Sequence, residues 1–323
     1  MYQDILKHNH MNVKKKMKIY QIKEGYCYNS DSLLLYDFIL PHIRHNDSLL
    51  DIGSGSGVIG MLCYKAKNIK LYQLEKQPEY VLFNAKNAKI NNIDSVIIHA
   101  DCNVLSDSKN ILMQLQENML CNYNKLKGLI NMQIAKFTQF NDSQNLSKSF
   151  SLHSSQTDLI KHSNTASLTY FDIIVSNPPF YQPNTLQSQN LLKSQATQSR
   201  YLPLESILKL ASKILKPHGK FIFCYSPSVI GEVLKKLKEF GFGVLYLRFV
   251  YPHIDRDAKL ILICAKLNSK AQTRILPPLI THVGTNQGDN TEEVRSIYKF
   301  ANIHSIKIAY NDIEWGNFMQ LTM

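Results

Sequence analysis

The four residues Asn177-Pro178-Pro179-Phe180 follow an apolar run over 171–176 that predicts a buried strand. A double proline cannot continue a strand, so Asn177 is expected at its carboxyl end, where open α/β sheets bind ligands. An amide acceptor beside two rigid prolines and an aromatic ring suits a flat molecule with an exocyclic amino group. Taken alone, the same residues are equally typical of a plain turn.

A second segment changes this balance. The loop Asp-Ile-Gly-Ser-Gly-Ser-Gly, from Asp51 to Gly57, joins a strand predicted over 48–52 to a helix predicted from about Val58. Glycines let the backbone turn tightly and let a ligand approach closely. Gly55, Gly57 and Gly60 also satisfy G-x-G-x-x-G, so a dinucleotide enzyme is one alternative.

Three acidic residues favour S-adenosylmethionine over a dinucleotide. Asp51 precedes the glycines, where it would repel a pyrophosphate but not a sulfonium-bearing amino acid. Glu75 ends the second predicted strand, where it can accept from both ribose hydroxyls, although a dehydrogenase has an acid there too. Asp101 follows the third strand, within reach of an adenine amino group. The structural alternatives are a turn cap for Asp51 and a surface carboxylate for Asp101.

The glycine loop and the Asn-Pro-Pro-Phe segment together resemble two motifs of the class I methyltransferases that act on amino or amide nitrogens. The resemblance implies an α/β fold with a Rossmann-like, mostly parallel seven-stranded sheet and helices on both faces. It also implies S-adenosylmethionine as cofactor. It assigns Gly53, Gly55 and Gly57 to the methionine moiety, Glu75 to the ribose and Asp101 to the adenine.

The segment over 25–35 is similar to the part of these enzymes that closes over the cofactor, with Asp31 at the matching polar position. The resemblance also implies how methyl transfer is assisted. The Asn177 side-chain oxygen and the Pro178 carbonyl accept from the amino hydrogens and draw the nitrogen towards tetrahedral geometry. Phe180, where the family more often has tyrosine, stacks on the base.

Four segments narrow the resemblance to the family that methylates N6 of the adenine just 3′ of the anticodon in a valine tRNA. They lie over 176–182, 249–258, 275–279 and 291–298. Guanine-N2 rRNA methyltransferases and protein glutamine-N5 methyltransferases carry the same Asn-Pro-Pro-Phe and remain alternatives. An idle RNA-binding module and a nicotinamide-dependent oxidoreductase are alternatives of other classes.

The charge of the chain agrees with a nucleic-acid partner, which we expect to be tRNA. The formal net charge is +12 and the isoelectric point is about 9.2, which favours polyanions, with an acidic membrane surface as a second choice. The residues expected to contact RNA are Tyr181, Arg200, Arg256 and the lysines of an N-terminal arm, Lys14, Lys15 and Lys16.

Predicted strands alternate with predicted helices, which implies a mostly parallel sheet. Besides 48–52 and 171–176, strands are expected over 70–75, 95–100, 220–225, 244–250 and 259–266. Helices are expected over 80–90, 204–215, 229–240 and 291–299, with one or two more within 111–129. Pro217-His218-Gly219 is expected to end the helix over 204–215, and Thr291 to cap the last helix. The expected parts are a basic arm over 1–24, a methyltransferase domain over 25–103 and 170–280, a low-complexity insertion over 104–169 and an extension over 281–323.

The six cysteines form no C-x-x-C pair, which indicates a reduced setting and no metal site. No apolar run reaches the roughly 18 residues needed to cross a bilayer, and the start of the chain lacks an apolar signal region. We therefore expect a cytoplasmic protein without a membrane partner, and a monomer.

Overall fold

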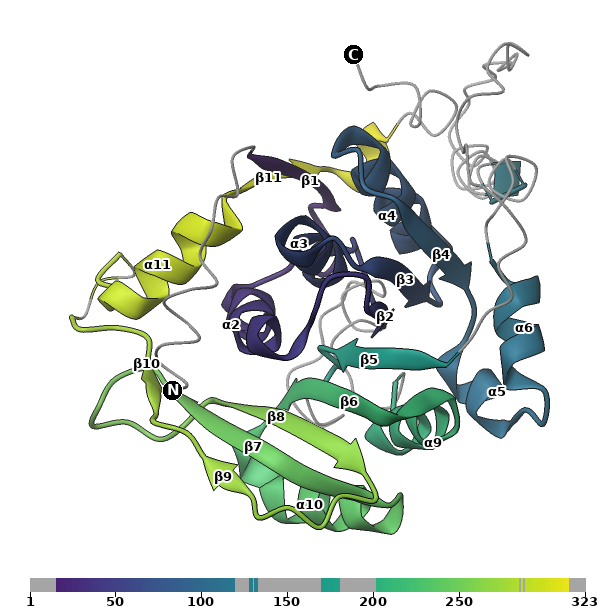
Figure 1. Cartoon of the computed structure of the whole chain (residues 1–323). Coiled ribbons are helices and arrows are strands. Elements are labelled where there is room, and N and C mark those ends of the chain that lie inside the picture. The colour runs from purple at the N-terminus through teal and green to yellow at the C-terminus, as the bar shows by residue number, and fades with distance from the viewer. Residues whose placement is uncertain are drawn as a thin grey trace.

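The computed structural model describes residues 16–119, 128, 129, 131, 132, 170–180, 202–284, 286 and 288–313. A nine-stranded sheet forms its centre (Figure 1). Across the sheet the order is β10 (Leu279–Ile280), β7 (Phe242–Tyr251), β8 (Leu260–Leu267), β6 (Leu215–Tyr225), β5 (Phe171–Ser176), β2 (Ser48–Ile52), β3 (Lys70–Glu75) and β4 (Ser95–His99), with β9 (Arg274–Ile275) beside β7. Only β8 runs antiparallel to its neighbours. The predicted fold class, α/β with a mostly parallel sheet, is confirmed, and the two-residue strands β9 and β10 are added to the seven strands expected.

The central strands β2, β3 and β5 have the predicted bounds. Most of their residues are buried because a parallel sheet covered on both faces leaves no solvent side. All five residues of β2 are buried, including Asp51. The strand that presents the glycine loop is therefore fixed on both sides by the core.

Helices cover both faces of the sheet (Figure 1). One face packs against α2 (Ser30–Ile39), α3 (Val58–Lys67) and α11 (Glu292–Ala301), and the other against α5 (Cys102–Asp107), α6 (Ile111–Glu117), α9 (Leu204–Ile214) and α10 (Ile230–Glu239). Helix α4 (Pro78–Ile90) contacts β3 and β4. As predicted, Thr291 caps α11, since its side chain accepts from the Val294 amide at 3.4 Å.

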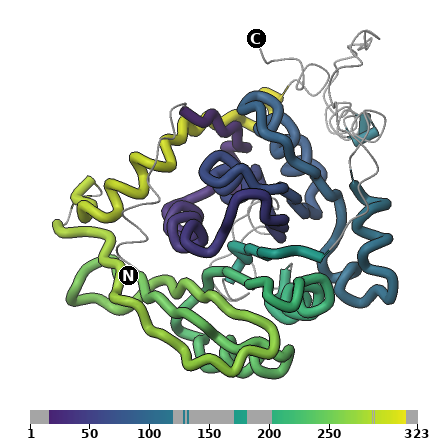
Figure 2. The backbone as a smooth tube through the Cα atoms, in the orientation of Figure 1, coloured from purple at the N-terminus to yellow at the C-terminus, as the bar shows by residue number. Residues whose placement is uncertain are grey.

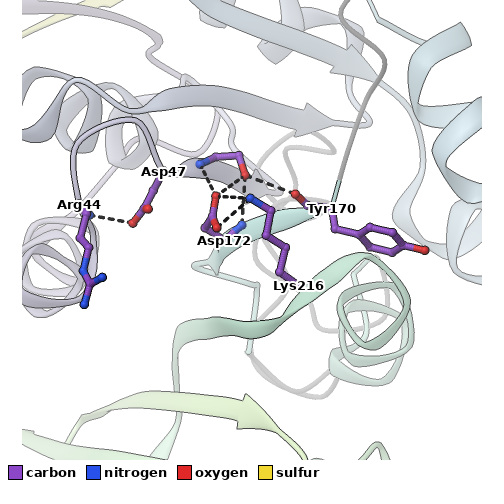
Figure 3. A network of polar contacts seen from close by, with 6 residues as sticks. Arg44, Asp47, Tyr170, Asp172 and Lys216 are labelled. Atoms are coloured by element: carbon purple, nitrogen blue, oxygen red, sulfur yellow. Dashed lines mark hydrogen bonds and ion pairs between the residues drawn. The ribbon is translucent and has the colours of Figure 1, made fainter.

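Strand β6 begins earlier than the predicted 220, because Leu215 to Gly219 continue it where a proline-glycine turn was expected. A register shift between Phe171 and Ile173 absorbs the extra residues. The start of the strand is held by Lys216, whose ammonium lies 2.8 Å from both carboxylate oxygens of Asp172 (Figure 3). The hydroxyl of Ser48, at the start of β2, donates to the same carboxylate at 2.7 Å.

A second sheet corrects the expected nature of the segment over 1–24. Strand β1 (Met17–Ile22) pairs in parallel with β11 (Ile303–Ile308), so that purple and yellow segments lie side by side in Figure 2. Met17, Ile19 and Ile22 are fully buried. The end of the expected arm is thus a core strand, whose alternating sequence was hidden by the lysine run before it.

The insertion expected over 104–169 begins as ordered helix. Leu105 of α5 and Ile111 and Leu115 of α6 are buried in the core beneath the sheet. The helix expected within 111–129 is confirmed for 111–117, and most of the remaining insertion lies outside the described residues. Among the described residues no helix is long and apolar enough to cross a bilayer.

Candidate functional site

A cavity of about 180 Å³ opens where β2, β3, β4 and β5 end. The carboxyl ends of parallel strands meet at one edge of a sheet, which is why residues far apart in sequence converge there. Six of the predicted site residues line it, namely Asp51, Gly53, Gly55, Glu75, Asp101 and Asn177.

The glycine loop takes a backbone path that favours glycine. Gly53, Gly55 and Gly57 have φ angles of 71°, 54° and 85°, in the left-handed region. A Cβ on Gly55 would meet nothing within 4 Å, so the space beside the loop is open to a ligand. A Cβ on Gly57 would collide with the side chains of Met61, Gln73 and Asn84. Gly57 does not line the cavity, so its role in this structure is to let α3 begin against the sheet.

Asp51 supports the junction between the loop and α3. One of its carboxylate oxygens accepts from the Gly60 amide at 3.2 Å, and the residue is only 1 % exposed. Burial, the opposing hydrogen bond from the Gly60 amide and the nearby Glu75 charge together raise the pKa of the Asp51 carboxyl to about 7, and burial is the largest of these causes. A positively charged ligand group beside Asp51 would relieve this cost.

Glu75 is held by three backbone amides. Gly55 donates to one carboxylate oxygen, and Lys76 and Gln77 donate to the other, each at 2.8 Å. Burial raises the pKa of Glu75, whereas these amides lower it. A carboxylate has about four acceptor positions, so the three amides fix its orientation and leave it able to accept from a ligand hydroxyl.

Asp101 is the residue directly before α5. One of its oxygens caps the helix by accepting from the Asn103 amide at 2.9 Å, and the other lies 2.7 Å from the ammonium of Lys76. Both Asp101 and Lys76 line the cavity. The residue is therefore both a helix cap and part of the candidate site.

Asn177 occupies the predicted position at the end of β5. Its carboxamide nitrogen donates to the Ser32 hydroxyl at 3.1 Å, and its oxygen accepts from the Cys224 thiol at 2.9 Å. Pro179 lines the cavity but Pro178 and Phe180 do not. The Phe180 ring is half-buried and lies against Tyr225, with centroids 5.9 Å apart.

Asp31 lies in the first turn of α2 and does not line the cavity. Its backbone amide donates to the Asn29 side chain at 3.1 Å, and the Asn29 amide donates back to the Asp31 carboxylate at 3.0 Å. Burial raises the pKa of Asp31, and its charge raises the pKa of the Cys224 thiol. Asp31 is thus close to the Asn177 side of the site.

Three tyrosines that were not predicted as site residues also line the cavity. They are Tyr26, Tyr28 and Tyr80. The Tyr80 hydroxyl accepts from the Tyr26 amide at 2.6 Å, which ties α4 to the segment before α2. Tyr26 and Tyr28 lie within the 25–35 segment expected to close over a cofactor, so their position in the sequence was an available signal.

The residues expected to contact RNA are only partly described. Lys14, Lys15, Tyr181 and Arg200 lie outside the described residues. Lys16 and Arg256 are both exposed, and Arg256 is in the hairpin between β7 and β8. Neither lines the cavity.

No family model matches the chain, and no curated protein matches it. Solved structures do match. A predicted O-methyltransferase from Agrobacterium tumefaciens aligns with a TM-score of 0.53 and 16 % identity, covering 86 % of this chain and all of that one. A methyltransferase from Pyrococcus furiosus aligns with a TM-score of 0.45 and 14 % identity, over 82 % of this chain and 98 % of that one.

A T. thermophilus 16S rRNA guanine-N2 methyltransferase, solved with AdoMet and guanosine, aligns at a TM-score of 0.40 and 16 % identity, over 75 % of this chain and 44 % of that one. Of these three structures only the one from Agrobacterium has a TM-score above 0.5, so the comparison of folds rests on that structure. The protein has the class I, Rossmann-like methyltransferase fold.

Proposed function

We propose that this protein is an S-adenosylmethionine-dependent methyltransferase that methylates N6 of the adenine 3′ of the anticodon in a tRNA. The observation that carries the proposal is one cavity lined by the glycine loop, Glu75 and Asp101 on one side and by the Asn177 amide on the other.

The cavity suits S-adenosylmethionine better than a dinucleotide. Its lining has three carboxyl groups, those of Asp51, Glu75 and Asp101, against the one ammonium of Lys76, and this excess favours a sulfonium and an ammonium group and opposes a pyrophosphate. The acceptor position left on Glu75 suits a ribose hydroxyl. The open side of Gly55 has room for the methionine moiety, and we assign the cavity-lining Gly53 to the same end of the cofactor.

The chain's own residues act on the acceptor nitrogen. S-adenosylmethionine supplies an electrophilic methyl group when bound. An adenine amino nitrogen is a weak nucleophile because its lone pair is delocalised into the ring. When the Asn177 oxygen and the Pro178 carbonyl accept hydrogen bonds from its two N–H groups, the lone pair localises towards the methyl group. The nitrogen becomes acidic once it carries the methyl group, and one of its protons is then lost to solvent. Placement of this kind is worth up to roughly 7–11 kcal/mol, and no strong base is required.

We assign Phe180, which follows the cavity-lining Pro179, to stacking on the target base. The residue is half-buried and its ring lies against Tyr225. Stacking of a base on an aromatic side chain is worth about 1–3 kcal/mol. Because an adenine inside a structured RNA must leave the stack to be reached, a loop is the expected target.

The choice of tRNA rests on the four sequence segments that resemble the tRNA adenine-N6 family and on the net charge of +12. A second candidate, guanine-N2 methylation of rRNA, is favoured by one residue, since Phe180 is typical of those enzymes. Both candidates require the same cofactor and the same Asn177 chemistry.

Labelled S-adenosylmethionine with total tRNA and rRNA tests the proposal. We expect N6-methyladenosine in tRNA when the modified nucleosides are identified by mass spectrometry. N2-methylguanosine in rRNA, or label in protein alone, would refute the tRNA assignment. Asn177→Ala should abolish transfer while S-adenosylhomocysteine still binds, and retained turnover in this variant would refute the mechanism.

A further inference from the structure

The carboxamide of Asn177 is held from two sides by residues of other elements. Ser32, in the first turn of α2, accepts from its nitrogen at 3.1 Å, and Cys224, in β6, donates to its oxygen at 2.9 Å. Ser32 is 2 % exposed and Cys224 is fully buried. Strands β5 and β6 pair directly up to Ser176 and Phe223, which places Cys224 beside Asn177.

The chemistry of the thiol fixes which way the amide faces. Burial raises the pKa of Cys224 well above its ordinary value, with the charge of Asp31 raising it further. The thiol therefore stays protonated near neutral pH and can donate. A donor prefers the amide oxygen, so the nitrogen of Asn177 faces Ser32, whose hydroxyl oxygen accepts.

Orientation matters because the terminal torsion of asparagine is broad and roughly two-fold. If the amide turned over, it would present an NH₂ group to an incoming amino group, and two donors would oppose each other. In the observed orientation, Cys224 uses one of the two acceptor positions on the oxygen and the other stays free for the acceptor substrate.

We propose that Ser32 and Cys224 are positioning residues that hold the Asn177 oxygen in the orientation needed to accept from the substrate amino group. This inference rests on the proposed function, since it concerns the same amide. Neither residue reacts. Ser32 also lines the cavity, whereas Cys224 acts from beneath it.

The chain offers a matched control for each residue. Cys264, in β8, is also a fully buried cysteine, belongs to the same apolar cluster as Cys224 and lies opposite Ile222 of the same strand. Ser106, in α5, is 2 % exposed like Ser32, and its hydroxyl donates to the Asn103 carbonyl. Neither control lines the cavity.

The test compares kcat, KM and the affinity for S-adenosylhomocysteine in these variants. Cys224→Ala and Ser32→Ala should each lower kcat by roughly two- to tenfold, the worth of one neutral hydrogen bond. Affinity for S-adenosylhomocysteine should stay within about threefold, and Cys224→Ser should recover most of the loss because its hydroxyl also donates. Cys264→Ala and Ser106→Ala should leave kcat unchanged.

Side-chain amide NMR signals give a readout that does not depend on turnover. The Asn177 amide signal is identified by its loss in Asn177→Ala, and it should move in Cys224→Ala but not in Cys264→Ala. Equal effects of Cys224→Ala and Cys264→Ala on kcat and on this signal would overturn the proposal, because the thiol would then act only by packing.

The two proposals fail in different ways. If Asn177→Ala retains full turnover, the proposed methyl-transfer mechanism is wrong. If Asn177→Ala is inactive while Cys224→Ala and Ser32→Ala both turn over like the wild type, the mechanism stands and only the positioning role is wrong.

Discussion

Replacing Glu75 by glutamine tests the cofactor half of the site. Glu75 is 8 % exposed, and its two oxygens accept three backbone amides at 2.8 Å. A glutamine must place its NH₂ either against the Gly55 amide or against those of Lys76 and Gln77. At least one charge-assisted hydrogen bond, worth about 1.5–3 kcal/mol, is lost, and the glutamine NH₂ group then faces a backbone N–H group that is also a donor.

We therefore expect Glu75→Gln to weaken S-adenosylhomocysteine binding by roughly 10- to 150-fold, since the amide that distorts first belongs to the glycine loop. Isothermal titration calorimetry measures the affinity, and chemical denaturation separates any loss of folding stability. Glu79→Gln is the matched control, because Glu79 is equally buried in α4 but does not line the cavity. Binding by Glu75→Gln within threefold of the wild type would refute the assignment.

Two further predictions concern buried charge. The folded-state pKa of Asp51 is raised from 3.8 to about 7, so the folded protein holds the extra proton and wild-type stability falls as pH rises from about 4 to 7. In Asp51→Asn, the decrease in the free energy of unfolding between pH 4 and 7 should be smaller by up to about 4 kcal/mol. Urea denaturation at several pH values measures it, and the same pH dependence in the variant and the wild type would contradict this prediction. Arg248 is 5 % exposed and bonds Glu293 of α11 at 2.7 Å. Because the Glu293 side chain is 40 % exposed, Arg248→Met should cost about 1.5–3 kcal/mol, the worth of the lost charge-assisted hydrogen bond. A loss below 1 kcal/mol in the same assay would contradict a stabilising role for this ion pair.

The parts of the site that sequence reasoning located are those set by local pattern. Strand ends and turns can be predicted from a few neighbouring residues. For this reason the sequence placed Gly53, Glu75 and Asn177 each at the end of a predicted strand. Parallel strands then bring such ends to one edge, which is why separate motifs lined a single cavity.

The features that the sequence analysis did not predict depend on contacts between segments far apart in the sequence. The pairing of β1 with β11, the placement of Phe180 against Tyr225 and the thiol contact to Asn177 each join residues that no local window contains. The early start of β6 depends on the register shift opposite Phe171 and on Lys216 meeting Asp172. Such choices are made by packing between elements, which overrides the turn signal of Pro217 and Gly219.

The parallel pairing of β1 and β11 has a consequence for the order of events during synthesis. The Gln21 side chain accepts from the Tyr28 amide at 2.7 Å and donates to Ser305, 284 residues later, so the wall of the cavity that contains Tyr28 is braced by β11. At 5–20 residues per second, about 15–60 s separate the two partners on the ribosome. A ligand that prefers the braced wall would therefore bind finished chains and stabilise them over incomplete ones.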